Sequence, residues 1–190
     1  MTSIGRVLLI VVALAAAAPA LGQYYPPPPY RVYRPPPENA LRVEIGGASL
    51  SSRYCPDGSG SCFSSDPWGA LALGVDLDLA LGRSPISLTL GAHEMLAPYY
   101  SGSPNVFEPW LGLTFKPLRY APVEPRLSIG GAGLIGNNGD TGGALRVGGG
   151  LSFFGSAFVG LAVDLMFDYG HIGAVDLFQV ELALGPEFRF

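Results

Sequence analysis

The sequence predicts an all-β protein in which eight antiparallel strands follow one another along the chain and close into an up-and-down barrel. From Leu41 to Phe190, apolar side chains alternate with polar or small ones, which is the period of two that a strand imposes. The segments between these runs are turn-like rather than helical, so consecutive strands are expected to pair as hairpins. The composition suits a sheet with one crowded face, because the chain has 27 Gly and only 14% charged residues.

The first 22 residues have the three-part layout of a secretory signal peptide. Arg6 precedes an apolar run from Val7 to Ala18, which is shorter than the ~20 residues of a membrane-spanning helix, and small residues follow the run. We expect cleavage after Gly22. A cut after Ala20 is the close alternative, and a retained anchor helix is the less favoured one.

Residues 23–40 form a separate segment that contains "QYYPPPPYRVYRPPPE". Runs of Pro favour the extended polyproline II conformation and do not enter the interior of a sheet. We interpret this segment as a spacer, with binding to a wall polymer or to a groove lined by aromatic residues as the alternative. The barrel then occupies residues 41–190.

Eight runs carry the strand pattern. The clearest is "ALALGVDLDLAL", in which Leu and Val take one face while Ala, Gly and Asp take the other. A helical period would spread these leucines around the whole circumference, so the run is interpreted as a strand. The expected strands are residues 41–50, 68–81, 86–97, 107–116, 126–135, 144–153, 157–168 and 176–190.

The residue types on the two faces predict which one points inward. The face opposite the leucines is largely Gly and Ala, which would make a poor solvated surface but suits the narrow interior of an eight-stranded barrel. We therefore expect the leucine face to contact lipid, since closure of the barrel satisfies every backbone N–H and C=O group within hydrocarbon. A soluble barrel with its leucines around an apolar ligand is the alternative.

Charged residues share the parity of the Gly/Ala face. On the lipid face an Arg would cost about 2–4 kcal/mol near the midplane, and a desolvated charge in the interior must be paired. We expect a hydrogen-bonded network that plugs the lumen, with the small residues leaving room for it and for Trp110, Phe158 and Met166. The members of the network are Arg42, Glu44, Asp76, Asp78, Arg126, Arg146, Asp164 and Glu181.

Aromatic residues gather toward the two ends of the expected strands, as in the belts that mark the two membrane interfaces. The belt on the side of the termini comprises Phe115, Tyr120, Phe153, Phe154, Phe188 and Phe190. The opposite belt comprises Trp68, Tyr99, Tyr100, Phe107, Phe167, Tyr169 and Phe178.

The strand pattern continues to the last residue, in "FQVELALGPEFRF". With this ending, residues 41–190 resemble the small eight-stranded outer-membrane barrels of Gram-negative bacteria, of the OmpA and OmpX type. In that family a C-terminal Phe after alternating apolar residues is read by the barrel assembly machinery; Phe188 and Phe190 match this signal, whereas Pro186 departs from it. The resemblance implies periplasmic termini, a periplasmic Pro-rich segment and long loops at the cell surface. It implies outer-membrane lipid and the assembly machinery as partners.

Cys55 and Cys62 are the only cysteines. An even count in a secreted chain, across a Gly/Ser-rich stretch, predicts a small loop closed by a disulfide. A metal site on the two thiols is less favoured, because no His stands nearby to complete it. We predict no metal, cofactor or catalytic residue, and the net charge of −4 gives no electrostatic footprint for nucleic-acid binding.

Three functions are compatible with such a barrel. We favour a non-enzymatic protein that serves envelope structure or surface interaction through its outer loops. The first alternative is a narrow channel with a slight cation preference. The second is an enzyme that modifies envelope lipid, with His93 or His171 as base. His93 has inward parity and His171 is expected in the last outer loop, and neither stands beside a nucleophile on one outward face, so we interpret His93 as structural.

Overall fold

The structure is a computed structural model that describes residues 38–55, 62–82, 84–97, 105–118 and 121–190. The expected signal peptide, residues 23–37 of the Pro-rich segment, and Tyr99, Tyr100 and Tyr120 of the expected belts lie outside these ranges. Within the described ranges, no helix has the length and hydropathy needed to cross a membrane.

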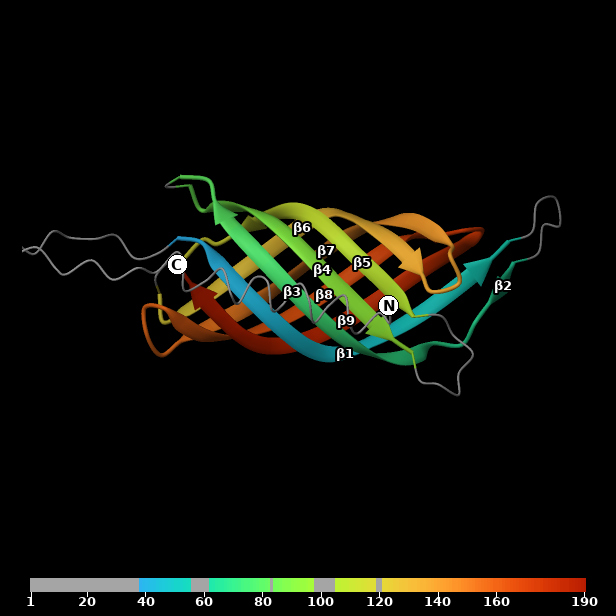
Figure 1. The fold of residues 1–190 in the computed structure, drawn as a ribbon, viewed down its shortest axis with the longest axis horizontal. Coiled ribbons are helices and arrows are strands. Elements are labelled where there is room, and N and C mark those ends of the chain that lie inside the picture. The colour runs from blue at the N-terminus through green and yellow to red at the C-terminus, as the bar shows by residue number, and fades with distance from the viewer. Residues whose placement is uncertain (1–37, 56–61, 83, 98–104, 119–120) are drawn as a thin grey trace, which may run out of the picture.

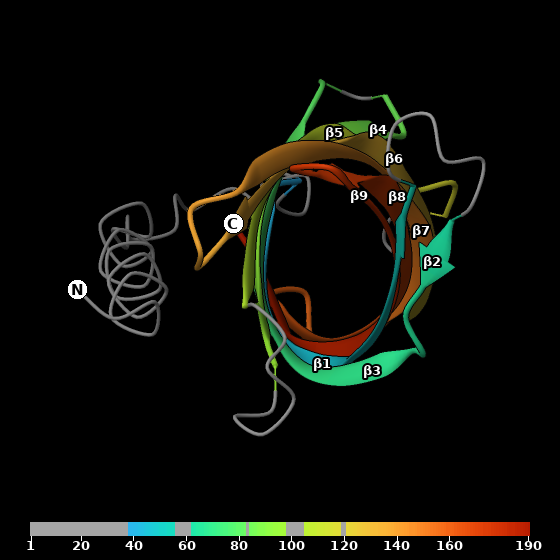
Figure 2. The ribbon, with the colours of Figure 1, turned by 90° about the vertical axis from the view of Figure 1, so that its right-hand side faces the viewer.

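The described chain forms one antiparallel sheet that closes on itself (Figures 1 and 2). Each long strand pairs with the next along the chain, and the last pairs with the first. This confirms the prediction of a closed eight-stranded up-and-down barrel. The strands are β1 (Ala40–Tyr54), β2 (Phe63–Ser64), β3 (Trp68–Ala80), β4 (Ile86–Leu96), β5 (Val106–Phe115), β6 (Val123–Gly136), β7 (Thr141–Phe154), β8 (Val159–Ile172) and β9 (Val175–Arg189).

The two ends of the barrel differ. At the end that we call the terminal end, the N–H of Asn39 donates to the carbonyl of Phe190 at 3.3 Å, so the start of β1 and the end of β9 lie side by side (Figure 1). At the opposite, loop end lie the connections at residues 55–67 and 97–105. There β2, which has only two residues, pairs with the last residues of β1 and extends that hairpin.

Several strands are longer than the sequence predicted. β1 and β8 end later, and β6 and β7 begin earlier, so the turns after β6 and β8 are tight. Gly139 and Gly173 make these turns with φ of 94° and 58°, a conformation that residues with a Cβ rarely adopt. His171 consequently lies in β8 opposite Asp176. The expectation that His171 belongs to a loop is wrong.

Three prolines lie within strands, and two of them, Pro109 and Pro186, each interrupt one ladder. The β1–β9 ladder is interrupted at Pro186 and the β5–β6 ladder at Pro109. Their other neighbours remain paired, with Pro186 opposite Leu161 and Pro109 opposite Ala92. Because Pro has no N–H to donate, it can join a sheet only where one ladder is dispensable. Pro186 therefore departs from the sequence pattern of the family without breaking the barrel.

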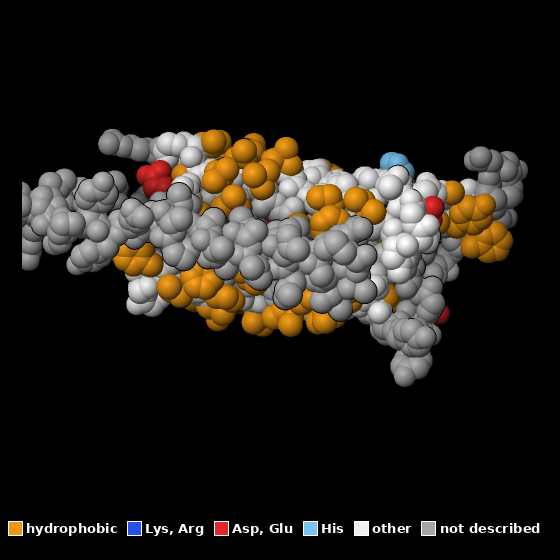
Figure 3. All heavy atoms as spheres, in the orientation of Figure 1, with side chains coloured by type: hydrophobic (Ala, Val, Ile, Leu, Met, Phe, Trp, Pro, Cys, Tyr) orange, Lys and Arg blue, Asp and Glu red, His pale blue; other side chains and the backbone are white. Residues whose placement is uncertain are grey.

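The outer wall of the barrel is apolar. The leucine face points outward, which makes the soluble alternative with inward leucines wrong, and Figure 3 shows hydrophobic side chains along the wall with acidic ones toward its ends. Soluble monomers rarely expose contiguous apolar patches larger than a few hundred Å², so this wall suits lipid. Its exposed residues include Ile45, Leu71, Leu90, Leu111, Leu113, Leu127, Ile129, Leu145, Val147, Leu151, Leu161, Leu165, Leu182 and Leu184.

The aromatic belts are only partly as expected. Phe153 and Phe188 near the terminal end, and Tyr169 and Phe178 near the loop end, are exposed on the strands that carry the apolar wall. Trp68 instead packs against apolar side chains inside the barrel, so its assignment to a belt is wrong. An aromatic residue on the inward parity of a strand end fills the mouth of the lumen rather than facing lipid.

We expect Ile129→Arg, in the middle of β6, to lower the free energy of unfolding of the barrel in a lipid bilayer by about 2–4 kcal/mol, because it places a charge on the lipid face. The matched change Val123→Arg, at the start of the same strand, is expected to cost only about 0–1 kcal/mol. Denaturant titration of the barrel in vesicles measures both. Equal costs at the two positions would contradict the lipid-facing assignment.

Candidate functional site

The lumen is filled by polar side chains that converge from opposite walls. All eight residues of the expected network lie on the inward face, with no more than 5% of their surface exposed, and each forms at least one ion pair with another member. They gather around two centres. One surrounds Arg146 toward the loop end, and the other surrounds Arg42 and Arg126 toward the terminal end.

Arg146 of β7 is the hub of the first centre. Its Nη1 donates to Glu108 Oε1 of β5 at 2.8 Å and to Asp168 Oδ2 of β8 at 3.1 Å, while its Nη2 donates to Glu181 Oε2 of β9 at 2.6 Å. The guanidinium also lies 5.5 Å from the centroid of the Trp110 ring, within the range of a cation–π contact. One side chain thus links four strands across the lumen.

His93 of β4 joins this hub to the opposite wall. Its Nδ1 lies 3.0 Å from Glu181 Oε1 and its Nε2 lies 3.1 Å from Asp76 Oδ1 of β3. The indole N–H of Trp110 donates to the same Asp76 oxygen at 2.8 Å. Both ring nitrogens of His93 therefore face carboxylates inside the barrel, which agrees with a structural role.

The second centre is organised by Arg42 of β1. Its Nη1 donates to Asp78 Oδ2 at 2.5 Å and its Nη2 to Asp76 Oδ2 at 3.3 Å, while its Nε lies 3.3 Å from Glu44 Oε1. Lys116, which follows β5, reaches across the lumen and places its Nζ 2.6 Å from Asp78 Oδ2. Asp76 is thus shared between the two centres.

Arg126 of β6 completes this centre from the other wall. Its Nε donates to Asp164 Oδ1 of β8 at 2.9 Å, its Nη2 makes a second bond to the same carboxylate, and its Nη1 donates to Glu187 Oε2 of β9 at 2.9 Å. A two-bond contact of this kind is strong and directional, because the guanidinium fork matches the carboxylate. The Arg126 guanidinium therefore holds β6 to β8 and β9, two strands with which β6 forms no ladder.

A row of hydroxyl groups fills the space beside these charges. Thr89 Oγ1 donates to Asp78 Oδ1 at 2.8 Å and lies 2.6 Å from Thr114 Oγ1, which in turn lies 2.8 Å from Ser128 Oγ. The row connects β3, β4, β5 and β6. Buried polar groups need hydrogen-bond partners, and the carboxylate of Asp78 is the partner of the first hydroxyl in the row.

Toward the loop end the lumen changes from charged to apolar. A cluster of inward side chains closes this part of the barrel, with Trp68, Ala144 and Ile172 packed against it. Leu50, Met95 and Leu134 of the cluster have at most 1% of their surface exposed. The cluster, which we call the apolar layer, comprises Ala48, Leu50, Ala70, Ala72, Met95, Val106, Leu134 and Leu177.

Inward glycines give these large side chains their space. A Cβ at Gly74 would lie 2.7 Å from the His93 ring, and one at Gly91 would overlap the Trp110 ring and Asp76. The expectation that small residues make room for bulky neighbours therefore holds for Trp110. It is wrong for Phe158, which lies in the turn before β8 with 60% of its surface exposed.

One cluster has the residue types of a metal site. Atoms of Glu44, Asp76 and His93 that could act as ligands lie within 4.8 Å of one another. The guanidinium of Arg42 already contacts both carboxylates, however, and His93 also contacts Glu181. These groups thus already have charged partners within the protein, and we assign no metal to this cluster.

Several members of the network are absent from the predicted set. They are Glu108, Lys116, Asp168, Gln179 and Glu187, all buried on the inward face. Each lies within an expected strand and shares the parity of an inward residue on that strand, so alternation is the signal that could have found them. Alternation gives the face of a residue but not its partners across the lumen.

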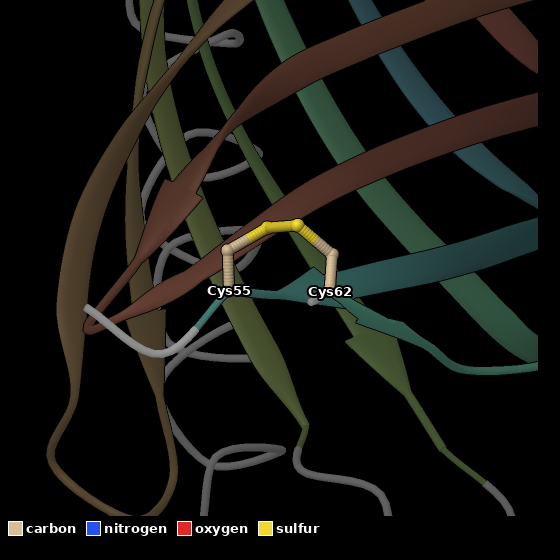
Figure 4. The surroundings of a disulfide bond; sticks show 2 residues. All are labelled: Cys55 and Cys62. Atoms are coloured by element: carbon tan, nitrogen blue, oxygen red, sulfur yellow. A yellow bond between two sulfur atoms is a disulfide. The ribbon is translucent and has the colours of Figure 1, made fainter. Parts of the chain in front are cut away.

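The two cysteines lie outside the lumen, at the tip of the hairpin that β1 and β2 form. Figure 4 shows Cys55 and Cys62 joined by a disulfide, and no free cysteine remains in the described chain. The bond connects the residue after β1 to the residue before β2. It therefore ties the end of β1 to the start of β2 beyond their short ladder.

These features define a class: a closed eight-stranded antiparallel barrel with an apolar wall and a filled polar lumen, which is the fold of small outer-membrane barrels. The chain is similar in structure to Neisserial surface protein A (TM-score 0.56, 16% identity, covering 80% of this chain and 100% of that one). It is also similar to the outer membrane protein OprG from Pseudomonas aeruginosa (TM-score 0.52, 12% identity, covering 81% and 98%). No protein-family model and no curated protein sequence matches the chain.

We expect Arg146→Ala to lower the free energy of unfolding by about 3–5 kcal/mol, because Glu108, Asp168 and Glu181 would lose their shared cation inside the barrel. Asp66→Ala, which removes one exposed charge at the loop end, is the control and should change it by less than about 0.5 kcal/mol. Denaturant titration followed by tryptophan fluorescence measures both. A loss for Arg146→Ala as small as the control would show that the network does not stabilise the barrel.

We expect Gly91→Ala to destabilise the barrel by about 1–3 kcal/mol, because the added methyl group has no room beside Trp110. Gly131→Ala makes the same chemical change on the outer face, where a Cβ meets no atom within 4 Å, and should be nearly neutral. Unfolding midpoints in one detergent compare the two variants. Similar midpoints would mean that the lumen has spare volume at Gly91.

Proposed function

We propose that this chain is a non-enzymatic outer-membrane barrel whose plugged lumen makes it a rigid scaffold, and that it serves envelope structure or surface interaction through its loop end. The observation that carries the proposal is the position of Arg146 and Arg126 inside the lumen, where each is bonded to strands that form no ladder with its own. The apolar layer lies beyond them toward the loop end. With the interior filled, the loops are the part of the molecule left free for contacts.

The orientation that we propose places both termini in the periplasm and the loop end at the cell surface. It is supported by the adjacency of Asn39 and Phe190 at one end, and by the longer connections and the disulfide at the other. Disulfides persist in oxidising surroundings such as the cell surface. In this orientation the Pro-rich segment is a periplasmic spacer or a ligand for the cell wall, and Phe188 and Phe190 are the signal for the barrel assembly machinery.

The surroundings of His93 support a non-enzymatic role. A base that activates a nucleophile needs one free ring nitrogen beside that nucleophile. Both nitrogens of His93 face carboxylates, and its side chain is fully buried in the lumen, away from the lipid wall. A lipid substrate on the wall has no route to this imidazole.

A second candidate, the narrow cation-preferring channel, is favoured by one observation. The described lumen holds more buried carboxylates than buried basic side chains. The carboxylates are Glu44, Asp76, Asp78, Glu108, Glu124, Asp164, Asp168, Glu181 and Glu187, whereas the basic groups are Arg42, Lys116, Arg126 and Arg146, with His93 between them. An acidic lumen would prefer cations wherever water threads it.

Two measurements on one preparation test the proposal. Unboiled membrane fractions should migrate differently from boiled ones in SDS gels, because closed membrane barrels resist the detergent until they are heated. The same protein in planar bilayers at about 1 M KCl should then give no discrete conductance steps, since the lumen is filled. A missing heat shift would refute the membrane barrel, whereas regular cation-selective steps would refute the plug and establish the channel.

A further inference from the structure

A groove of about 210 Å³ lies at the loop end, where β8, β9, β1 and β2 meet. Its lining includes Ser51, Arg53 and Ser64 from the β1–β2 hairpin, with Tyr169 of β8 and Asp176 of β9. Neither the lumen network nor the apolar layer uses any of these five residues. We refer to it as the outer groove.

The register places these side chains on the lipid-facing side of the wall. Arg53 pairs with Asp176 on one side and with Ser64 on the other, and Ser51 and Tyr169 both pair with Phe178. Residues directly opposite each other in a sheet point to the same face. Phe178 continues the outward parity of Leu182 and Leu184, so the outer groove opens outward rather than into the lumen.

The outer groove offers one cation and several hydroxyl groups. Arg53 is exposed, and within the described chain no ion pair of 4.0 Å or less joins it to a carboxylate, although Asp176 stands opposite. A guanidinium fork recognises phosphate with two parallel hydrogen bonds, and serine hydroxyls can donate further ones. Asp176 is placed to accept hydrogen bonds from hydroxyls of the same ligand.

The surroundings indicate that such a ligand carries apolar chains. Tyr169 and Phe178, with 63% and 45% of their surfaces exposed, form the side of the outer groove toward the wall. From them the outward parity continues along β8 and β9 through Phe167, Leu165 and Leu182. Aromatic residues at this level mark the zone of lipid headgroups, so a ligand bound at Arg53 can lay its chains on the wall below.

We propose that the outer groove binds the headgroup of a phosphorylated, hydroxyl-rich lipid, with Arg53 on the phosphate. The proposal rests on the proposed function, because it requires the barrel to be inserted in a membrane. Its chemistry matches a phosphorylated sugar headgroup better than a phosphate ester without hydroxyls, since Ser51, Ser64 and Asp176 can satisfy hydroxyl groups beside the phosphate.

The test uses the purified full chain in a neutral polyoxyethylene detergent, with lipid A, a bisphosphorylated glucosamine lipid, as the probe. We expect lipid A to bind, and Arg53→Gln to weaken its affinity about tenfold, as is typical of a lost charge-assisted hydrogen bond. Asp66→Asn, which changes another exposed charge at the loop end, should keep the affinity of the wild type. Native mass spectrometry of the protein–lipid complexes gives the dissociation constants.

Two further probes distinguish the sources of the phosphate. Phosphatidic acid, a phosphate ester with no headgroup hydroxyls, should bind more weakly than lipid A, and millimolar inorganic phosphate should not displace lipid A. Equal lipid A binding by wild type and Arg53→Gln would overturn the proposal, as would full displacement by inorganic phosphate, which would indicate a free-anion site. The heat shift in SDS gels is recorded for every variant, so failure of the barrel itself is distinguishable from failure of the outer groove.

Discussion

The pairing of β9 with β1 is the constraint on which the rest of this structure depends. An open sheet of eight strands would leave two edges of unpaired N–H and C=O groups, which hydrocarbon cannot satisfy. Closing the sheet with only eight strands leaves a bore just wide enough for fitted side chains. Inward glycines, such as Gly91 beside Trp110, follow from that narrow bore, as does the outward placement of the leucines.

The narrowness of the bore also determines how the charges inside it interact. Charges inside it have lost most of their water, so each needs partners within reach, and the three arginines provide them. Arg42 holds carboxylates of its neighbour β3, whereas Arg126 and Arg146 also hold carboxylates of strands that share no ladder with their own. The ion pairs and hydrogen bonds inside the lumen are thus a second set of connections, which supports the ring that the backbone hydrogen bonds form.

The sequence predicted the barrel and the inward charges because both depend on a period of two. Arg42 and Asp78 share an alternation that runs through whole strands, and lipid outside makes any exception costly. The sequence could not predict which side chains meet across the lumen. The pairing of Arg146 with Glu108 depends on strand tilt and on rotamers rather than on spacing along the chain.

The other errors came from the ends of strands. There, the choice between strand and loop depends on turn geometry, as the tight turn at Gly173 shows by keeping His171 in β8. Trp68 is a different case, because β3 begins at Trp68 as expected and its shared parity with Ala70 and Ala72 already points inward. An aromatic residue at a strand end belongs to a belt only if its parity is that of the lipid face.

The apolar layer at the loop end also separates the buried ion pairs from the medium on that side. Dissolved salt screens exposed charges over a Debye length of about 8 Å at physiological ionic strength, but it screens buried ion pairs much less. Leu50, Met95 and Leu134 stand between that medium and Arg146. The lumen network therefore keeps its electrostatics when the salt concentration at the loop end changes, whereas exposed charges at that end, such as Arg53, respond to it directly.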